Sequence, residues 1–273
     1  MIIAQVSDTH IKKNDQLAYN KVDTQKALKK CVSHINKLLP KPDMVVFSGD
    51  NVDFGNEEEY ILFKSIIEEL TIPFYIIPGN HDLNENLKKV FYEHQWDDDS
   101  NFLNFSLDDF PLQIIGLDSS IPKTNYGELC KKRLSWLEKQ LIKLKNKKAL
   151  VFMHHPPIKV GIDHMDIQNL KKGSKELGKL LQKYPNVIGI ACGHVHRSSF
   201  TLWNNTIVST APSPSHQVVL DLNKDSIPAF TIEPPSIHLH YWQEDTGLTT
   251  HISLIDKFEG PFPFYDEQGN LID

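Results

Sequence analysis

The sequence predicts an α/β fold in which strands and helices form layers around one core. Six short segments are almost continuously apolar, and longer segments between them repeat apolar residues at helical spacing. Continuous apolar runs are typical of strands that are covered on both faces. Stripes at helical spacing predict amphipathic helices that pack on such strands. The length of 273 residues and the hydrophobic content of 40% allow one sizeable core with a small appendage.

These patterns define the individual elements. The predicted strands are residues 2–6, 44–47, 74–77, 112–117, 150–153 and 187–192. The predicted helices are residues 24–39, 57–70, 134–144 and 176–184. Asn56 and Glu59 have the spacing of a capping pair at the start of the second helix.

The segment after residue 222 differs from the rest of the chain, because prolines interrupt it repeatedly. Residues 237–242 and 248–255 predict two strands, and the Glu-Asp-Thr-Gly sequence between them predicts a turn. This C-terminal β-hairpin extension is followed by an irregular tail with several aromatic residues. His238 and His240 alternate along the first strand, and we expect them at the surface or at an interface.

Composition and charge exclude several classes of protein. The net charge of −6 argues against nucleic acid as a partner, because tracking a phosphate backbone requires positive charge. Cys31, Cys130 and Cys192 are odd in number and widely spaced, so they predict no disulfide framework and indicate a reducing compartment. No apolar run approaches the roughly 20 residues of a membrane span, and the apolar start has no basic leader. We therefore expect a cytoplasmic enzyme that does not bind a membrane.

Asp, Asn or His residues, which can all bind metal ions, follow five of the predicted strands. These candidates are Asp8, His10, Asp50, Asn80, His154, His194 and His196. In open α/β sheets the carboxyl ends of the strands are where ligands bind. Each motif alone has an ordinary reading, such as a capping aspartate, a turn or a hydrogen-bonded histidine. All five in this order, each at a strand end, favour a common site.

The chemistry of these donors predicts two metal ions. Seven oxygen and nitrogen donors exceed the three or four that a catalytic zinc needs, and they suit two divalent ions that share a carboxylate. Mixed oxygen and imidazole ligands favour Mn, Fe, Zn or Co over Ca. The absence of cysteine from the motifs argues against a structural zinc.

The five blocks Asp-x-His, Gly-Asp-x-x-Asp, Gly-Asn-His-Asp, His and Gly-His-x-His resemble the calcineurin-like metallophosphoesterase family over roughly residues 1–220. Met-His-His-Pro-Pro and Cys-Gly-His-Val-His are most similar to the cyclic-nucleotide phosphodiesterases and the bacterial glycerophosphodiesterases of that family. The resemblance implies a two-sheet sandwich flanked by helices. It also implies a catalytic domain at residues 1–222, with residues 223–273 forming a hairpin and tail that act as a lid or as a homo-oligomer interface.

The same resemblance implies the ligand sets and the reaction. Asp8, His10, Asp50 and His196 would hold the first ion, and Asp50, Asn80, His154 and His194 the second, so that Asp50 bridges them. Two such cations clamp a phosphate and lower the pKa of a bridging water. The hydroxide then attacks phosphorus in a small phosphodiester, either a cyclic nucleotide or a glycerophosphodiester.

Four further residues are candidates for catalysis or substrate binding. His81 follows Asn80 directly, so we expect both to face the substrate, with His81 supplying the proton to the leaving group. Asp53 resembles the carboxylate that partners this histidine in the family. His155 follows a predicted ligand and has a supporting or substrate-side role, and His216 is a pocket candidate by resemblance.

Other functions remain open at this point. A phosphomonoesterase could use the same core. A non-catalytic scaffold could retain the fold, although none of the seven predicted ligands is missing. Phosphoprotein phosphatases carry Arg and Glu where Phe54 and Asp82 stand, which weakens that assignment. Purple acid phosphatases use a tyrosine ligand where Asp53 stands, which argues against a purple iron centre.

Overall fold

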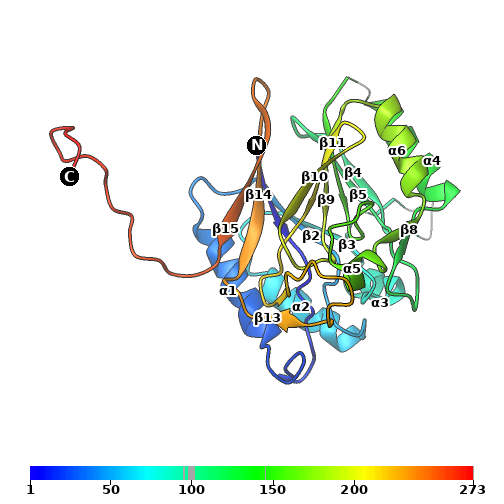
Figure 1. Ribbon diagram of the computed structural model, residues 1–273, viewed down its shortest axis with the longest axis horizontal. Coiled ribbons are helices and arrows are strands. Elements are labelled where there is room, and N and C mark those ends of the chain that lie inside the picture. The colour runs from blue at the N-terminus through cyan, green and yellow to red at the C-terminus, as the bar shows by residue number, and fades with distance from the viewer. Residues whose placement is uncertain (95, 98–101, 145, 273) are drawn as a thin grey trace.

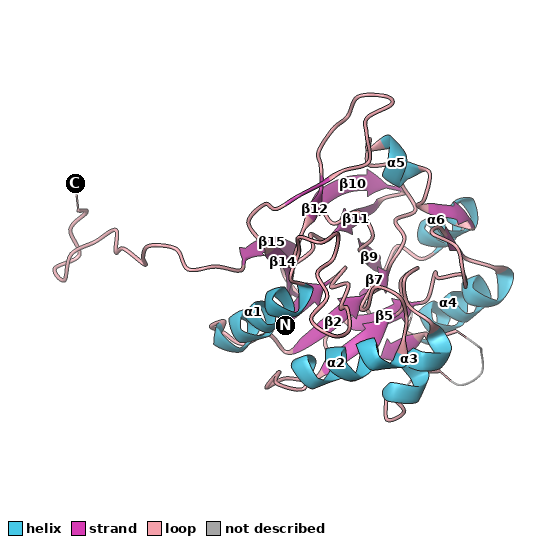
Figure 2. Cartoon of the chain, turned by 90° about the horizontal axis from the view of Figure 1, so that it is seen from below, coloured by secondary structure: helices cyan, strands magenta, loops and turns pink. Residues whose placement is uncertain are grey.

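Two β-sheets lie face to face, and helices cover their outer faces (Figures 1 and 2). The computed structural model describes residues 1–94, 96–97, 102–144 and 146–272. The first sheet contains β1 (Ile2–Val6), β2 (Met44–Ser48), β3 (Phe74–Ile77), β14 (Ser236–Gln243) and β15 (Gly247–Leu254). The second contains β4 (Phe105–Leu107), β5 (Gln113–Leu117), β7 (Ala149–Met153), β9 (Val187–Cys192), β10 (Ser199–Trp203) and β11 (Thr206–Thr210). Two short pairs remain, β6 (Gly127–Glu128) with β8 (Leu170–Lys172), and β12 (Gln217–Val218) with β13 (Phe230–Thr231).

The strand order places the parallel strands next to one another in each sheet. The first sheet has the order β15-β14-β1-β2-β3 and the second the order β10-β11-β9-β7-β5-β4. Within them β1, β2 and β3 are parallel, as are β5, β7, β9 and β11. All six strands predicted from apolar runs are present, and the two-sheet sandwich flanked by helices is confirmed.

Apolar side chains fill the space between the sheets and beneath the helices. Ile3 and Phe47 of the first sheet share one core with Ile114 and Phe152 of the second. A separate core lies under the helices that cover the second sheet, where Leu137 is buried. Each central strand is thus covered on both faces, which explains its continuous apolar run.

The helices divide between the two sheets (Figure 2). Those beside the first sheet are α1 (Thr24–Lys37), α2 (Glu57–Ile67) and α3 (Asn84–Val90), and those on the second are α4 (Lys131–Lys143) and α6 (Ser174–Lys183). A short helix, α5 (Asp163–Asp166), stands apart. The predicted capping pair is confirmed, since the Glu59 carboxylate accepts the Asn56 backbone N–H at 3.1 Å. Helix α3 was missed because it buries only Leu87 and so has no apolar stripe.

The C-terminal hairpin is built into the first sheet. Strand β14 pairs antiparallel with β1 on one side and with β15 on the other. Ile237 and Trp242 of β14 are buried in the core between the sheets. The first sheet therefore takes strands from both sides of residue 222.

The expectation of a surface position for His238 and His240 is wrong. Both rings are buried, because the second sheet covers β14. The His238 ring stacks on Phe200 of β10, and the His240 Nε2 lies 3.0 Å from the Gln5 Oε1 of β1. Alternation along β14 correctly places both on one face, but that face points inward.

The tail beyond the hairpin does not join the sheets as the hairpin does. Residues 256–272 extend away from the sheets (Figures 1 and 2). Phe258, Phe262, Phe264 and Tyr265 are exposed there, and Phe264 reaches 79%. Among the residues that the structure describes, no helix is long and apolar enough to cross a membrane.

Candidate metal centre

All seven predicted metal ligands meet at the carboxyl ends of the parallel strands. Asp8 and His10 follow β1, Asp50 follows β2, and Asn80 follows β3. His154 follows β7, and His194 and His196 follow β9. Six of the seven are buried, and Asn80 is partly buried. The first sheet thus supplies the oxygen donors and one imidazole, and the second supplies the other imidazoles.

The distances within this cluster match two neighbouring cation sites. Asp50 Oδ2 lies 3.3 Å from His154 Nε2 and 3.7 Å from His10 Nε2. His196 Nε2 lies 3.4 Å from Asp8 Oδ1 and 3.1 Å from His10 Nε2. Asp8, His10 and His196 form one group of possible ligands, and Asp8, Asp50 and His154 form another.

Three buried donor atoms in the cluster make no hydrogen bond, although His154 Nε2 lies 3.3 Å from Asp50 Oδ2. Asn80 Oδ1, His154 Nε2 and His194 Nε2 are buried and have no hydrogen-bond partner among the described residues. Buried polar atoms normally find partners, so three orphans at one point require an explanation. A cation held between them satisfies all three. The donor set present in this chain therefore fits a metal centre.

The other ring nitrogen of three predicted ligands is held by the protein. Nδ1 of His154 lies 2.9 Å from the Ser48 carbonyl oxygen, and Nδ1 of His196 lies 3.2 Å from the His216 carbonyl oxygen. Nδ1 of His10 lies 3.2 Å from Asp53 Oδ1. Such contacts fix the ring orientation and leave Nε2 facing the other ligands of the cluster, which is the arrangement of metal-binding histidines.

The backbone is strained where the ligands project. Asp8, His10, Asp50, His194 and His196 have φ angles of 57°, 45°, 50°, 73° and 54°. Non-glycine residues rarely adopt this left-handed conformation, and strained residues concentrate at functional sites. The glycines of the motifs allow close approach, since a Cβ atom at Gly79 would collide with the Asp50 carboxylate. The Gly-Asn-His-Asp block thus needs its glycine for packing.

Protons in the cluster compete with cations. Burial opposes the charged form of His154, but Asp50 and Asp8 outweigh it and raise its pKa to about 9. Burial raises the pKa of Asp8 to about 6. Burial and the neighbouring His10 lower the pKa of His196 to about 3, so this ring is neutral and ready to act as a ligand. A cation that binds here displaces the His154 proton.

His81 and Asp53 lie next to each other at the edge of the cluster. The His81 backbone N–H donates to Asp50 Oδ1 at 2.8 Å, and its Nδ1 lies 2.7 Å from the Asp53 carbonyl oxygen. The Asp53 carboxylate is 3.8 Å from the His81 ring but 3.2 Å from His10 and 2.7 Å from Lys12. Asp53 therefore holds His81 chiefly through its backbone and orients His10 through its side chain.

His155 and His216 occupy different places. His155 is fully buried behind the ligands, with Nδ1 at 2.9 Å from Ser119 Oγ, and its ring meets those of His154 and His194. His216 is buried against the His196 ring at 4.6 Å and lines the cavity beside the cluster. Burial and the neighbouring imidazoles lower the pKa of His216 to about 2, so it is a neutral ring.

A cavity of about 420 Å³ opens beside the cluster. Its inner lining includes His10, Asp50, Asn80, His81, His194, His196 and His216. Its outer lining is Tyr19, His164, Met165, Gln168, Val218, Pro228, Ala229 and Phe230. No sequence motif points to the outer group, because these residues come from loops, the short helix α5 and short strands. His155 is not among the lining residues.

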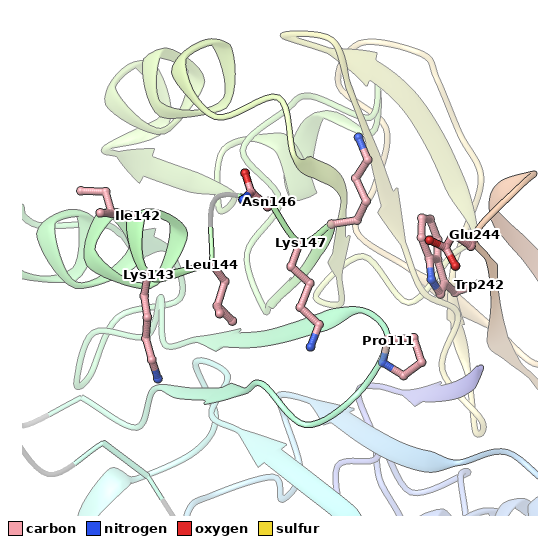
Figure 3. Close-up of a pocket in the computed structure, with 9 residues that line it drawn as sticks. Pro111, Ile142, Lys143, Leu144, Asn146, Lys147, Trp242 and Glu244 are labelled. Atoms are coloured by element: carbon pink, nitrogen blue, oxygen red, sulfur yellow. The ribbon is translucent and has the colours of Figure 1, made fainter.

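A larger cavity of about 770 Å³ lies at the opposite edge of the sheets (Figure 3). It is lined by lysines that precede β7 and by Trp242 at the end of β14. Two of these lysines are engaged elsewhere, since Lys143 pairs with the Asp108 carboxylate and Lys147 donates to the Asp108 carbonyl. None of the predicted site residues reaches this cavity.

The fold and the site define the class of metal-dependent phosphoesterases. The chain belongs to the calcineurin-like phosphoesterase family, whose model matches residues 1–198. The resemblance carried by the five motif blocks is therefore confirmed.

Individual relatives cover most or all of the chain. A protein of Arcobacter nitrofigilis named probable glycerophosphodiester phosphodiesterase GpdQ is 60% identical over 273 residues, 100% of each chain. The 3′,5′-cyclic adenosine monophosphate phosphodiesterase CpdA of Escherichia coli K12 is 27% identical, over 92% of this chain and 88% of its own. A solved dimetal phosphatase from Danio rerio has a TM-score of 0.67 at 12% identity, over 93% of this chain and 99% of that one. At that identity the solved structure shows the shared fold alone.

Proposed function

We propose that this protein is a dinuclear-metal phosphodiesterase that hydrolyses a small phosphodiester. Asp8, His10, Asp50 and His196 would hold one divalent ion, and Asp50, Asn80, His154 and His194 would hold the other. The observation that carries this assignment is the set of orphaned buried donors on Asn80, His154 and His194. Bound Mn, Fe, Zn or Co would supply positive charge to the phosphate and an activated water as nucleophile.

The protein's own groups position the substrate and move a proton. His81 has its Nδ1 engaged by the Asp53 carbonyl, so its Nε2 is the nitrogen available to a leaving oxygen. Asp53 fixes both His81 and His10. His216 contributes a neutral ring to the cavity wall, and the burial of His155 supports a packing role behind the ligands.

The relatives favour glycerophosphodiesters as substrates. The protein that shares 60% of this sequence is named for that activity. A cyclic nucleotide is the second candidate, supported by the family members named for it and by the aromatic residues of the outer cavity. Turnover of glycerophosphodiesters and of cyclic AMP by metal-supplemented enzyme tests the two directly. Retention of metal without hydrolysis of any phosphodiester would contradict the proposal and favour a scaffold.

We expect diesters to be hydrolysed faster than matched monoesters. A monoester dianion gains more from a guanidinium or ammonium group than a diester monoanion does. The cavity lining contains neither Lys nor Arg, and nearby Lys12 is committed to Asp53 at 2.7 Å. We predict that kcat/KM for methyl p-nitrophenyl phosphate exceeds that for p-nitrophenyl phosphate.

A single substitution can test the reason for that preference. Phe54 is exposed beside the site, where phosphoprotein phosphatases carry Arg, so Phe54→Arg should raise the relative rate on the monoester. Phe200→Arg adds the same charge on β10, at a residue that does not line the cavity, and should leave the ratio unchanged. A wild-type enzyme that prefers the monoester would contradict the proposal of a diesterase.

We also propose that the tail forms a homo-oligomer interface. Four aromatic side chains between residues 258 and 265 are exposed on a segment that leaves the body, and such patches mark interaction sites. Deleting residues 257–273 keeps both sheets, whereas a cut after Leu222 would remove β14 from β1. The deletion should reduce the assembly to monomers in light scattering. A monomeric full-length protein would instead favour the lid alternative.

The three cysteines support a cytoplasmic location. Cys31, Cys130 and Cys192 are all free thiols, and burial raises the pKa of Cys31 and Cys192 above their usual range. Free thiols without a disulfide suit a reducing compartment.

A further inference from the structure

Three rings form a continuous wall on one side of the cavity beside the metal cluster. The rings of Tyr19 and Phe230 stack with their centroids 4.8 Å apart and an interplanar angle of 29°. Both meet the His216 ring edge to face, at 5.4 Å and 5.7 Å. Tyr19 lies in the loop after β1 and Phe230 lies on β13, so distant parts of the chain build this wall.

Phe230 is carried by a segment that is anchored next to a predicted metal ligand. We call residues 217–233, which include β12 and β13, the 217–233 flap. Arg197 directly follows His196, and its guanidinium donates to both Glu233 carboxylate oxygens at 3.0 Å. It also donates to the Val218 carbonyl at 2.7 Å. Through the ion pair with Glu233 and the hydrogen bond to Val218, Arg197 joins both ends of the flap to the segment that carries His196.

The outer lining of the cavity contains both apolar and polar groups. Val218 pairs with Phe230 across β12 and β13 and packs in one apolar cluster with Met165, whereas His164 and Gln168 provide polar groups. The volume of about 420 Å³ lies in the range of small-molecule sites and exceeds the need of a phosphate alone. A phosphodiester is formed from two alcohol groups. A cavity with both apolar and polar lining residues can receive these two groups at different places.

We propose that the 217–233 flap forms a subsite for one alcohol of the diester, and that Phe230 selects an alcohol with a flat apolar face, such as a nucleobase or an aryl group. This inference rests on the proposed function, because the phosphate must lie at the metal cluster. Aromatic pairs attract beyond the burial of their area. Hydroxyl groups of a polyol would lose water against the Phe230 ring without gaining a partner, so such alcohols are better placed beside polar groups such as Gln168.

Competitive inhibition separates the subsite from the metal centre. Phenyl phosphate and methyl phosphate share the phosphate but differ in the ring, and their inhibition constants are measured on metal-loaded enzyme. Phe230→Ala should raise the inhibition constant of phenyl phosphate about three- to tenfold and change that of methyl phosphate less than about twofold. Phe200→Ala removes an exposed ring that packs on His238 and does not line the cavity, so it should alter neither constant.

The anchoring role of the ion pair has its own variant. Glu233→Gln retains the size of the side chain but removes the charge that faces Arg197. If the pair positions Phe230, this variant should raise the inhibition constant of phenyl phosphate more than that of methyl phosphate, as Phe230→Ala does. A purely structural role would change both inhibition constants together.

Two results would overturn the proposal in distinguishable ways. If methyl phosphate inhibits but Phe230→Ala leaves the ratio of the two constants unchanged, the subsite is wrong and the metal-centre assignment stands. If neither compound inhibits the metal-loaded wild-type enzyme, the proposed function fails and the subsite fails with it.

Discussion

Replacing Asp50 by alanine is expected to remove metal from both sites and to abolish hydrolysis. Asp50 Oδ2 is the carboxylate oxygen that lies within reach of His154 on one side and His10 on the other, at 3.3 Å and 3.7 Å. Losing residues that merely support a ligand costs about 10- to 100-fold in affinity or activity, so losing a bridging ligand should cost more than about 100-fold. Elemental analysis should find close to no metal per chain, against two in the wild-type protein.

Two variants control this measurement. His10→Ala removes a ligand of the first site only, so one metal per chain should remain. Asp245→Ala removes an exposed carboxylate in the turn between β14 and β15 and should retain both metals. Full occupancy in Asp50→Ala would show that Asp50 does not bridge, and a loss of both metals in His10→Ala would mean that the two sites are not separable.

Replacing His81 by alanine should damage the hydrolysis of diesters with poor leaving groups most. The His81 side chain is 37% exposed at the cavity, and its Nδ1 is held by the Asp53 carbonyl, which leaves Nε2 to protonate an alkoxide. General acid catalysis contributes about a hundredfold or more. We therefore expect a loss of about that size with alkyl leaving groups and a much smaller loss with p-nitrophenolate, which needs no proton.

A comparison of leaving groups distinguishes this role from phosphate binding. His251→Ala removes an exposed imidazole on β15 and should leave both rates unchanged. Equal losses on alkyl and aryl substrates would contradict the proton-transfer role of His81 and would indicate that it positions the phosphate. The plot of log kcat against leaving-group pKa should steepen in His81→Ala if the role is correct.

Local sequence was sufficient for the central strands and for the candidate ligands. Residues 2–6, 74–77 and 187–192 were predicted with the bounds that the structure has, because strands covered by other elements are almost continuously apolar. The donor residues follow such strands directly, so strand direction alone brings them to one edge. The bridging position of Asp50 came from family resemblance, and the geometry of the cluster is compatible with it.

Other features depend on contacts between distant parts of the chain, which no local pattern reports. The pairing of β14 with β1 joins residues more than 200 positions apart and turns His238 and His240 toward the core. The contact of Asp53 with His10 and the stacking of Tyr19 on Phe230 likewise arise only when loops pack together. Sequence alone therefore determined the strands and the donor types, whereas tertiary packing decided which side chains orient the ligands and which line the cavity. The physical reason is that strand and motif signals act over a few residues, while the walls of a site are built by burial across the whole fold.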